Sequence, residues 1–295
     1  MNRALPGRFL HLASALLAGC GSHSVLSPGG PIAAGNRQIM LDALGIMLAI
    51  VVPTMIASVW FAWWFRAGNP RARYKPSFVY SGRIEMIVWS IPILVILFLG
   101  GVIYIGSHDL DPARPIASTH ETVEVQVVSL DWKWLFIYPR EGVASVNRLV
   151  VPAGVPVRFR LTSASVMNVF FVPRLGTMIY AMNGMETKLH LMADKPEQFY
   201  GQSAHFSGDG FPGMKFTVHA LPPDRFAQWS KGVRGNRLDA AAYARLARQS
   251  SDVPAFDYSS VVPGLFDGIV SHRIAPAAGP GEGRGGPGVS PEPLS

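Results

Sequence analysis

Two long apolar segments near the N-terminus stand out in the hydrophobic pattern of the chain. Residues 43–65 and 87–106 contain no charged side chain, and about 20 apolar residues in a helix are enough to cross the ~30 Å hydrocarbon layer of a bilayer. Each segment holds one proline, Pro53 or Pro92, which transmembrane helices tolerate. The pattern predicts a two-helix transmembrane hairpin over residues 40–107.

The pattern changes to a period of two after the hairpin. Val123, Val125 and Val127 alternate with Glu124 and Gln126, as expected for a half-buried strand. Further short strands with regular turn signals follow across residues 119–223, which predicts an all-β sandwich or barrel. The expected fold class is therefore membrane α plus all-β.

The C-terminal part has a different composition again. Residues 224–271 include the stretch "RLDAAAYARLARQ", which favours helix by propensity, and we expect a short helical arm there. Residues 272–295 are rich in proline and glycine and lack apolar core residues, which predicts a disordered tail.

The first twenty residues have the layout of a secretory signal. Arg3 and Arg8 precede an apolar stretch that ends in small residues before Cys20, the pattern of a leader covering residues 1–19. The ending "LAGC" resembles the bacterial lipobox, which implies that Cys20 becomes the lipid-carrying first residue of the mature chain, followed by a linker over residues 20–39. The alternatives are cleavage elsewhere and an uncleaved leader.

Charge refines the topology. The net charge is +7, but the basic residues form no dense patch with interleaved aromatics, so we expect no nucleic-acid partner. Residues 66–83, between the apolar segments, carry five Lys or Arg and no Asp or Glu. The positive-inside rule places this loop in the cytoplasm, with the N-terminus and the C-terminal domain outside.

The order of these parts, together with three motifs, resembles subunit II of the haem–copper terminal oxidases, closest to the branch of cytochrome bo-type ubiquinol oxidases. The motifs are "SLDWKWLFIYP", "VMNVFFVPRLGTMIYAMNGMETKLHL" and "YGQSAHFSGDGFPGMKF". The resemblance runs from about Cys20 to about Val270. It implies a cupredoxin-like fold for residues 119–223.

The resemblance also assigns the positions of a lost copper site. In relatives that oxidise cytochrome c, two His, two Cys, one Met and a backbone carbonyl hold a dinuclear copper centre. The corresponding positions here are Asn168, Ser203, His205 (the carbonyl position), Ser207, Phe211 and Met214. Serine hydroxyls cannot replace the soft thiolates that copper prefers. We therefore expect no metal and no cofactor in this chain.

A different copper site is the alternative. It would be built from His190, His205, His219 and Met214, but it would lack the thiolate of a blue-copper centre. Histidines in and beside strands are more often surface or packed residues. In the copper-bearing relatives, the aromatic stretch that corresponds to Trp132 and Trp134 receives electrons from cytochrome c. We interpret these two tryptophans as packing residues. We interpret the methionines Met178, Met182 and Met185 in the same way.

Glu85 lies at the start of the second apolar segment. An ionisable residue at a membrane boundary suggests a function, and the resemblance implies a place at the mouth of a proton pathway into the catalytic subunit. The alternative is an interfacial carboxylate paired with Arg83 or solvated by headgroups.

These observations predict a non-haem subunit of a proton-translocating quinol:oxygen oxidoreductase in the bacterial inner membrane. The chain would have no catalytic residue of its own. The resemblance implies that the haems and copper lie in the partner catalytic subunit I, and that ubiquinol is the substrate of the complex. The alternatives are a copper-bearing subunit II of a cytochrome c oxidase, whose ligands are missing here, and a membrane-tethered cupredoxin-like binding lipoprotein.

Overall fold

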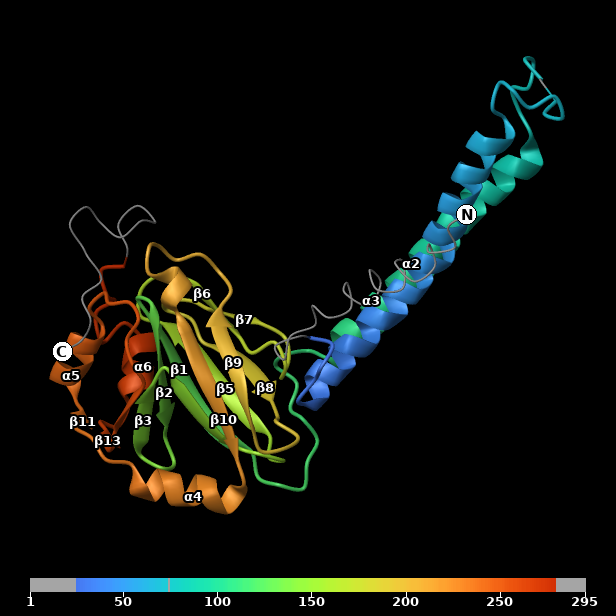
Figure 1. Ribbon diagram of the computed structural model, residues 1–295. Helices are drawn as coiled ribbons and strands as arrows, with labels where there is room; N and C mark the ends of the chain where they lie inside the picture. Colours follow the sequence, from blue (N-terminus) through green and yellow to red (C-terminus); the bar gives the residue numbers. More distant parts are fainter. Residues whose placement is uncertain (1–24, 74, 280–295) are drawn as a thin grey trace, which may run out of the picture. The chain divides into compact units, whose positions relative to one another are not determined.

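The computed structural model describes residues 25–73 and 75–279 (Figure 1). Contacts divide the chain into two compact units. One comprises residues 35–111; the other comprises the residues up to 34 together with those from 112 onward. The predicted leader, the predicted lipid-carrying Cys20 and the last part of the predicted tail lie outside the described residues.

The first unit is a helical hairpin. Helices α2 (Pro31–Trp64) and α3 (Gly82–Asp109) are long and apolar enough to cross a membrane, and the most apolar window of each has no buried residue. A helix that is apolar on all sides suits hydrocarbon rather than water. Gly106 marks a close approach of the two helices, since a Cβ there would lie 2.4 Å from the side chain of Ile39.

Helix α2 begins earlier than the sequence pattern predicts. It starts at Pro31, inside the stretch expected to be a linker. Proline is favoured in the first turn of a helix, where its fixed φ fits and its missing N–H costs nothing. Residues at its start belong to the same unit as the β domain and bind it: the N–H of Gly29, just before the helix, donates to the carbonyl of Arg174 at 2.7 Å, and the N–H of Ala33, in the first turn, donates to the carbonyl of Leu175 at 3.2 Å.

The second unit contains a two-layer β-sandwich, as the alternating pattern predicts. The first sheet has the spatial order β12 (Phe256–Tyr258), β3 (Val143–Val146), β2 (Lys133–Tyr138), β1 (Val123–Leu130), β5 (Val157–Ser163), β8 (Thr187–Leu191). The second has the order β4 (Arg148–Pro152), β10 (Lys215–Leu221), β9 (Glu197–Ser203), β6 (Asn168–Phe171), β7 (Ile179–Ala181). The pairs β1/β5 and β4/β10 are parallel, and the other neighbours are antiparallel.

An aromatic cluster fills the space between the sheets. Trp134 and Phe136 from β2 meet Phe170 from β6 and Phe216 from β10; the rings of Phe170 and Phe216 stack with centroids 5.1 Å apart, and Trp134 meets Phe170 edge-on at 5.5 Å. All four side chains are buried. Truncating one such side chain to alanine typically costs about 3–5 kcal/mol of stability, so this cluster holds the two sheets together.

The C-terminal arm covers the outer face of the first sheet. It contains helices α4 (Pro223–Gly232), α5 (Ala240–Leu246) and α6 (Leu265–Val270) and the short parallel pair β11 (Arg237–Leu238) and β13 (Ser260–Val261). A second core joins Leu135 and Ile137 of β2 to Tyr243 and Phe266 of the arm. Figure 1 shows α5 and α6 beside the first sheet and α4 across the end of the sandwich.

The arm differs from the predicted helical segment in two respects. Short strands interrupt the helices, and β12 extends the first sheet by pairing with β3. The predicted disordered tail is also ordered in its described part, where Ala277 donates to the carbonyl of Ala164 at 2.8 Å. The cause is the outer face of β1 and β2, which is apolar and stays exposed until the arm covers it.

Candidate functional site

The positions of the predicted lost copper site lie at one end of the second sheet. Ser203 ends β9, Asn168 begins β6, and the two strands pair antiparallel next to these residues, with Phe170 opposite Ser203. The segment from residue 204 to 214 then leads to β10 and includes a short 3-10 turn, Phe211–Gly213. The structure thus brings Asn168 and Ser203 together although they are far apart in the sequence.

Two of the predicted ligand positions bind each other. The Ser203 hydroxyl donates to Asn168 Oδ1 at 3.1 Å and lies 3.4 Å from the carbonyl oxygen of His205. Both side chains are buried. The Ser203 N–H donates to the carbonyl of Met214 at 3.1 Å. A hydroxyl–amide pair therefore stands where the resemblance places a thiolate and an imidazole.

The other predicted positions are occupied by packing interactions. The Met214 side chain is buried in the core between the sheets. The ring of Phe211 meets that of Phe206 edge-on at 5.8 Å, and the ring of His205 meets that of Tyr180 edge-on at 6.1 Å. The rings of His205 and Phe211 are therefore engaged with neighbouring aromatic side chains.

Ser207 and Trp132 fix the centre of the loop. The carbonyl of Ser207 accepts a hydrogen bond from Trp132 Nε1 at 3.0 Å. The Ser207 hydroxyl is buried and has no hydrogen-bond partner among the described residues. Trp132 has a left-handed backbone, with φ of 66°, in the turn between β1 and β2. Its ring lies so close to Gly210 that a Cβ there would sit 2.2 Å from it.

The contact of Trp132 with the loop is not apparent from the sequence. Trp132 and Trp134 are both buried inside the domain, which confirms their interpretation as packing residues. The methionine run is only partly a packing element, since Met178 and Met185 are exposed. Two features of the sequence hint at the contact between Trp132 and the loop: a glycine in the loop, Gly210, and a tryptophan in a tight turn, Trp132.

This residue set does not fit a copper ion. An amide, two hydroxyls and a phenyl ring replace the imidazoles and thiolates that copper prefers. No group of three or more His, Cys, Asp or Glu suited to a metal occurs in the part of the chain that the structure describes. The alternative histidine set is not assembled either, because His190 lies in β8 of one sheet and His219 in β10 of the other.

The environments of these two histidines favour their neutral forms. Burial lowers the pKa of His190, and the nearby Arg158 and Lys188 lower it further, while a contact of its Nδ1 with the carbonyl of Pro112 acts in the opposite direction. Burial also lowers the pKa of His219, assisted by Arg148. Both are therefore packed histidines in cationic surroundings.

Four exposed apolar side chains lie in β7, in the segments on either side of it and in the loop. We call them the Met/aromatic patch; they are Met178, Tyr180, Met185 and Phe206, which are between 47% and 62% exposed. Tyr180 belongs to β7, and its ring contacts His205, the neighbour of Phe206. Exposed apolar patches of this kind commonly mark protein interfaces.

Glu85 lies in the first turn of α3, in the hairpin unit. Its side chain is exposed, and its N–H donates to the carbonyl of Ser81 at 3.0 Å. Arg83 lies in the same turn. A carboxylate in the first helical turn interacts favourably with the helix dipole. Cys20 lies outside the described residues.

Two known families match this chain. The family described as "Cytochrome C oxidase subunit II, periplasmic domain" matches residues 125–221. The family described as "COX Aromatic Rich Motif" matches residues 234–273. The first range covers most of the sandwich, and the second covers most of the arm beyond α4.

Relatives extend the match to most of the chain. The "Ubiquinol oxidase subunit 2" of Acetobacter aceti is 44% identical over 265 residues, which cover 88% of this chain and 86% of that protein. The "Cytochrome bo(3) ubiquinol oxidase subunit 2" of Pseudomonas putida is 47% identical over 261 residues, covering 88% and 83%. Among solved structures, the periplasmic domain of subunit II of cytochrome oxidase from Bradyrhizobium japonicum matches 37% of this chain and 90% of that one, with 26% identity and a TM-score of 0.35.

Proposed function

Because the chain belongs to the subunit II family of bo-type ubiquinol oxidases, a branch of the haem–copper oxidases, we propose that it anchors and caps the catalytic subunit I without carrying electrons itself. The complex is an oxidoreductase. Its catalytic subunit would take electrons from ubiquinol and reduce oxygen to water, and the haems and copper would lie there.

The observation that carries this proposal is the hydrogen-bonded pair Ser203–Asn168 in the centre of the loop. A subunit that accepts electrons from cytochrome c needs a metal relay in its outer domain. Ubiquinol is lipid-soluble and can deliver electrons within the membrane, so an outer domain without ligands suits a quinol oxidase.

Two features support the anchoring and capping roles. Helices α2 and α3 expose apolar side chains along their lengths, which can pack against lipid and against other transmembrane helices. The Met/aromatic patch offers the outer domain an apolar surface for a partner. Methionine side chains are flexible and polarisable, and they adapt well to such a surface.

A substitution in the patch tests the capping role. Phe206→Asp places a charge on a side chain that is 62% exposed, so the domain should still fold, but subunit I should dissociate more readily in detergent. Ala227→Asp, on the exposed face of α4, is the matched control. Retention of the haem-containing partner by both variants to the wild-type extent would contradict a capping contact at this patch.

The proposed topology follows from the charges of the chain. With residues 66–83 in the cytoplasm, the N-terminus and the sandwich lie in the periplasm and α2 and α3 cross the inner membrane. We also propose that the leader is removed and that Cys20 carries lipid. Intact mass spectrometry should find a chain that begins at Cys20 with added acyl mass, and a mature chain that begins at Met1 would refute this.

We further propose that Glu85 helps to form a proton entrance of the complex. Its exposed carboxylate lies at the end of α3 that this topology places in the cytoplasm. A carboxylate at such a boundary can take protons from water and pass them to groups in a partner subunit. These protons would serve oxygen reduction and proton translocation.

A further inference from the structure

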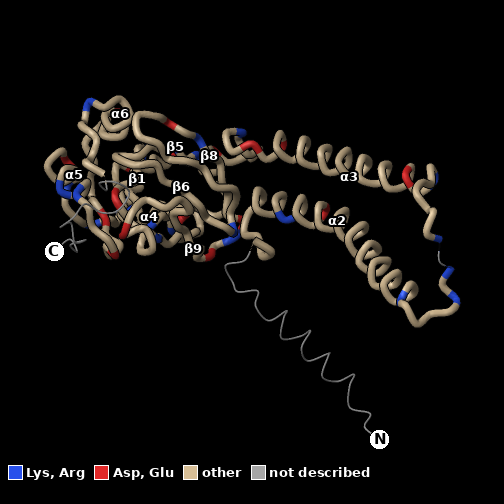
Figure 2. The backbone as a smooth tube through the Cα atoms, turned by 90° about the horizontal axis from the view of Figure 1, so that it is seen from above, with Lys and Arg blue, Asp and Glu red and all other residues tan. Residues whose placement is uncertain are grey.

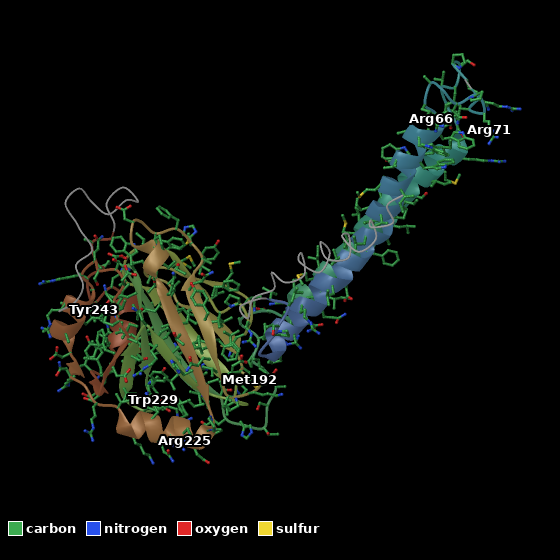
Figure 3. All side chains as sticks on the ribbon, viewed as in Figure 1. Arg66, Arg71, Met192, Arg225, Trp229 and Tyr243 are labelled. Atoms are coloured by element: carbon green, nitrogen blue, oxygen red, sulfur yellow. The ribbon has the colours of Figure 1, made fainter. Side chains whose placement is uncertain are left out.

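The loop between α2 and α3 borders a cationic cavity that is open at the surface and lined mostly by exposed side chains. The cavity has a volume of about 540 Å³ and is lined mainly by Phe65, Arg66, Asn69, Arg73, Lys75 and Phe78. Figure 2 shows the Lys and Arg residues gathered on this connection, and Figure 3 shows the side chains of Arg66 and Arg71 at the same end of the hairpin. Three of the lining side chains are cationic, and two are aromatic.

Hydrogen bonds fold the first half of the loop onto the end of α2. Asn69 Nδ2 donates to the carbonyl of Trp64 at 2.6 Å, and Asn69 Oδ1 accepts from the N–H of Arg71 at 3.1 Å. Arg66 Nη1 donates to the carbonyl of Trp63 at 3.0 Å, and its guanidinium lies 5.0 Å from the centre of the Trp63 ring. The backbone of the cavity is therefore built by specific contacts at the last turn of the helix.

The charge of the cavity favours an anion. Residues 66–83 contain five Lys or Arg and no Asp or Glu, so no acidic side chain of the loop balances Arg66, Arg73 and Lys75. The positive-inside rule accounts for the number of these charges. It does not account for the arrangement of three of them around one cavity beside Phe65 and Phe78.

The position of the cavity selects the kind of anion. Trp60, Trp63 and Trp64 lie in the last turns of α2, and tryptophans of this kind mark the boundary between hydrocarbon and headgroups. A cavity directly beyond them lies at the level of lipid phosphates. Its aromatic residues suit the glycerol and upper acyl region of a lipid, and its cations suit the phosphate.

We propose that this cavity binds the headgroup phosphate of an anionic phospholipid. The site rests on the hairpin lying in a membrane and does not depend on the proposed roles of the outer domain. Arg73 and Lys75 bind the phosphate, while Arg66, already held by Trp63, shapes the wall. The bound lipid ties the loop to the membrane surface.

The test uses the oxidase complex that contains this chain, purified in detergent and supplied with phosphatidylglycerol. Native mass spectrometry measures how much lipid stays bound. Loss of both cations in Arg73→Gln/Lys75→Gln should weaken retention about 25-fold, since each cation near an anionic lipid contributes about a factor of five. Arg71→Gln/Arg83→Gln removes the same charge from side chains that do not line the cavity and should weaken retention less, because these side chains do not reach the phosphate.

Two further arms make the outcome decisive. Inorganic phosphate is added as a competitor to wild type, and it should fail to displace phosphatidylglycerol; displacement at millimolar phosphate would show a free-anion site and overturn the lipid assignment. Equal retention by the two double variants would overturn the cavity as the site.

If Arg73→Gln/Lys75→Gln does not assemble, Lys75→Gln and Arg71→Gln are compared in the same way. Haem content and quinol turnover should stay unchanged, so a failure here is separate from a failure of the proposed function.

Discussion

At the residue scale, Ser203 and Asn168 are the pair that closes the loop without a metal ligand. They occupy positions where the resemblance expects a thiolate and an imidazole, and they satisfy each other by a hydrogen bond of 3.1 Å inside a buried site. A buried polar group that lost its partner would cost about 1–3 kcal/mol. The pair therefore makes the loop stable without a metal.

The first prediction concerns copper. A soluble fragment of residues 112–279 should retain only substoichiometric copper after copper loading and dialysis, because its donors are hydroxyl, amide and thioether groups. Elemental analysis measures the metal content, and a retained equivalent of copper would contradict the prediction. The fourfold variant Asn168→His, Ser203→Cys, Ser207→Cys, Phe211→His should bind copper and become coloured if the loop has kept its shape.

The second prediction concerns Gly210. Gly210→Ala should lower the free energy of unfolding of this fragment by about 1–3 kcal/mol, because the new methyl group overlaps the ring of Trp132. Thermal unfolding followed by tryptophan fluorescence measures the effect. Gly232→Ala, whose Cβ would meet nothing within 4 Å, is the control and should not be destabilised. Equal midpoints for the two variants would show that Trp132 does not hold the loop.

The third prediction concerns Glu85. Glu85→Gln should slow oxygen consumption several-fold at saturating ubiquinol, normalised to haem content, because the amide cannot carry a proton. Glu85→Asp keeps a carboxylate and should retain most of the rate. Wild-type turnover in Glu85→Gln would reduce Glu85 to an interfacial residue, while the family membership of the chain would stand.

At the element scale, the arm and strand β2 depend on each other. Lys133 of β2 is buried, and its Nζ donates to the carbonyl of Arg248 and to the hydroxyl of Ser250, both at 2.6 Å, and to the carbonyl of Asp131 at 3.2 Å. Arg160 of β5 makes a second tie: it binds Asp267 of α6 at 3.1 Å, and its guanidinium lies 5.0 Å from the centre of the Phe266 ring. Polar and apolar contacts together fix the arm.

The fourth prediction is a pH dependence that comes from Lys133. Burial lowers the pKa of Lys133 to about 8, while the nearby Asp131 acts in the opposite direction. An unfolded chain has a lysine pKa of about 10.4. Between about pH 8 and pH 10 the unfolded state therefore binds more protons, and the free energy of unfolding of the fragment should rise with pH, by about 2–3 kcal/mol in total.

Two tyrosines determine the pH above which the free energy of unfolding stops rising. Burial raises the pKa of Tyr138 and of Tyr243, so above about pH 10 the unfolded state loses phenolic protons that the folded state keeps, and stability should fall. Urea titrations across this range measure the curve. Lys133→Met should lack the rise between pH 8 and pH 10; the same rise in wild type and variant would assign it to other groups.

The elements differ in how far the sequence predicts them. Helices α2 and α3 and the first strand follow from local patterns, because apolar length and alternation are visible within a short window. The arm does not, because the pairing of β12 with β3 and the covering of Leu135 and Ile137 join segments far apart in the chain. The identities of the site residues came from the resemblance, but the Ser203–Asn168 bond depends on how β6 and β9 pair, which the sequence does not reveal.

At the scale of the whole molecule, the chain combines a hairpin of two helices that are long and apolar enough to cross a membrane with a β-sandwich domain. The hairpin offers apolar helices and a cationic loop, and the sandwich offers the Met/aromatic patch. Each of these surfaces suits a partner or a lipid, whereas the loop after Ser203 is closed by hydrogen bonds and packed rings. This arrangement fits a subunit that supports electron transfer elsewhere in its complex.

The most direct test is the choice of electron donor by the complex purified through an affinity tag on this chain. Oxygen consumption is measured with ubiquinol and, separately, with reduced cytochrome c, together with the haem spectrum of the sample. We expect a haem-containing partner and oxygen consumption that ubiquinol supports and cytochrome c does not. A sample without haem, or one that consumes oxygen with cytochrome c as donor, would contradict it.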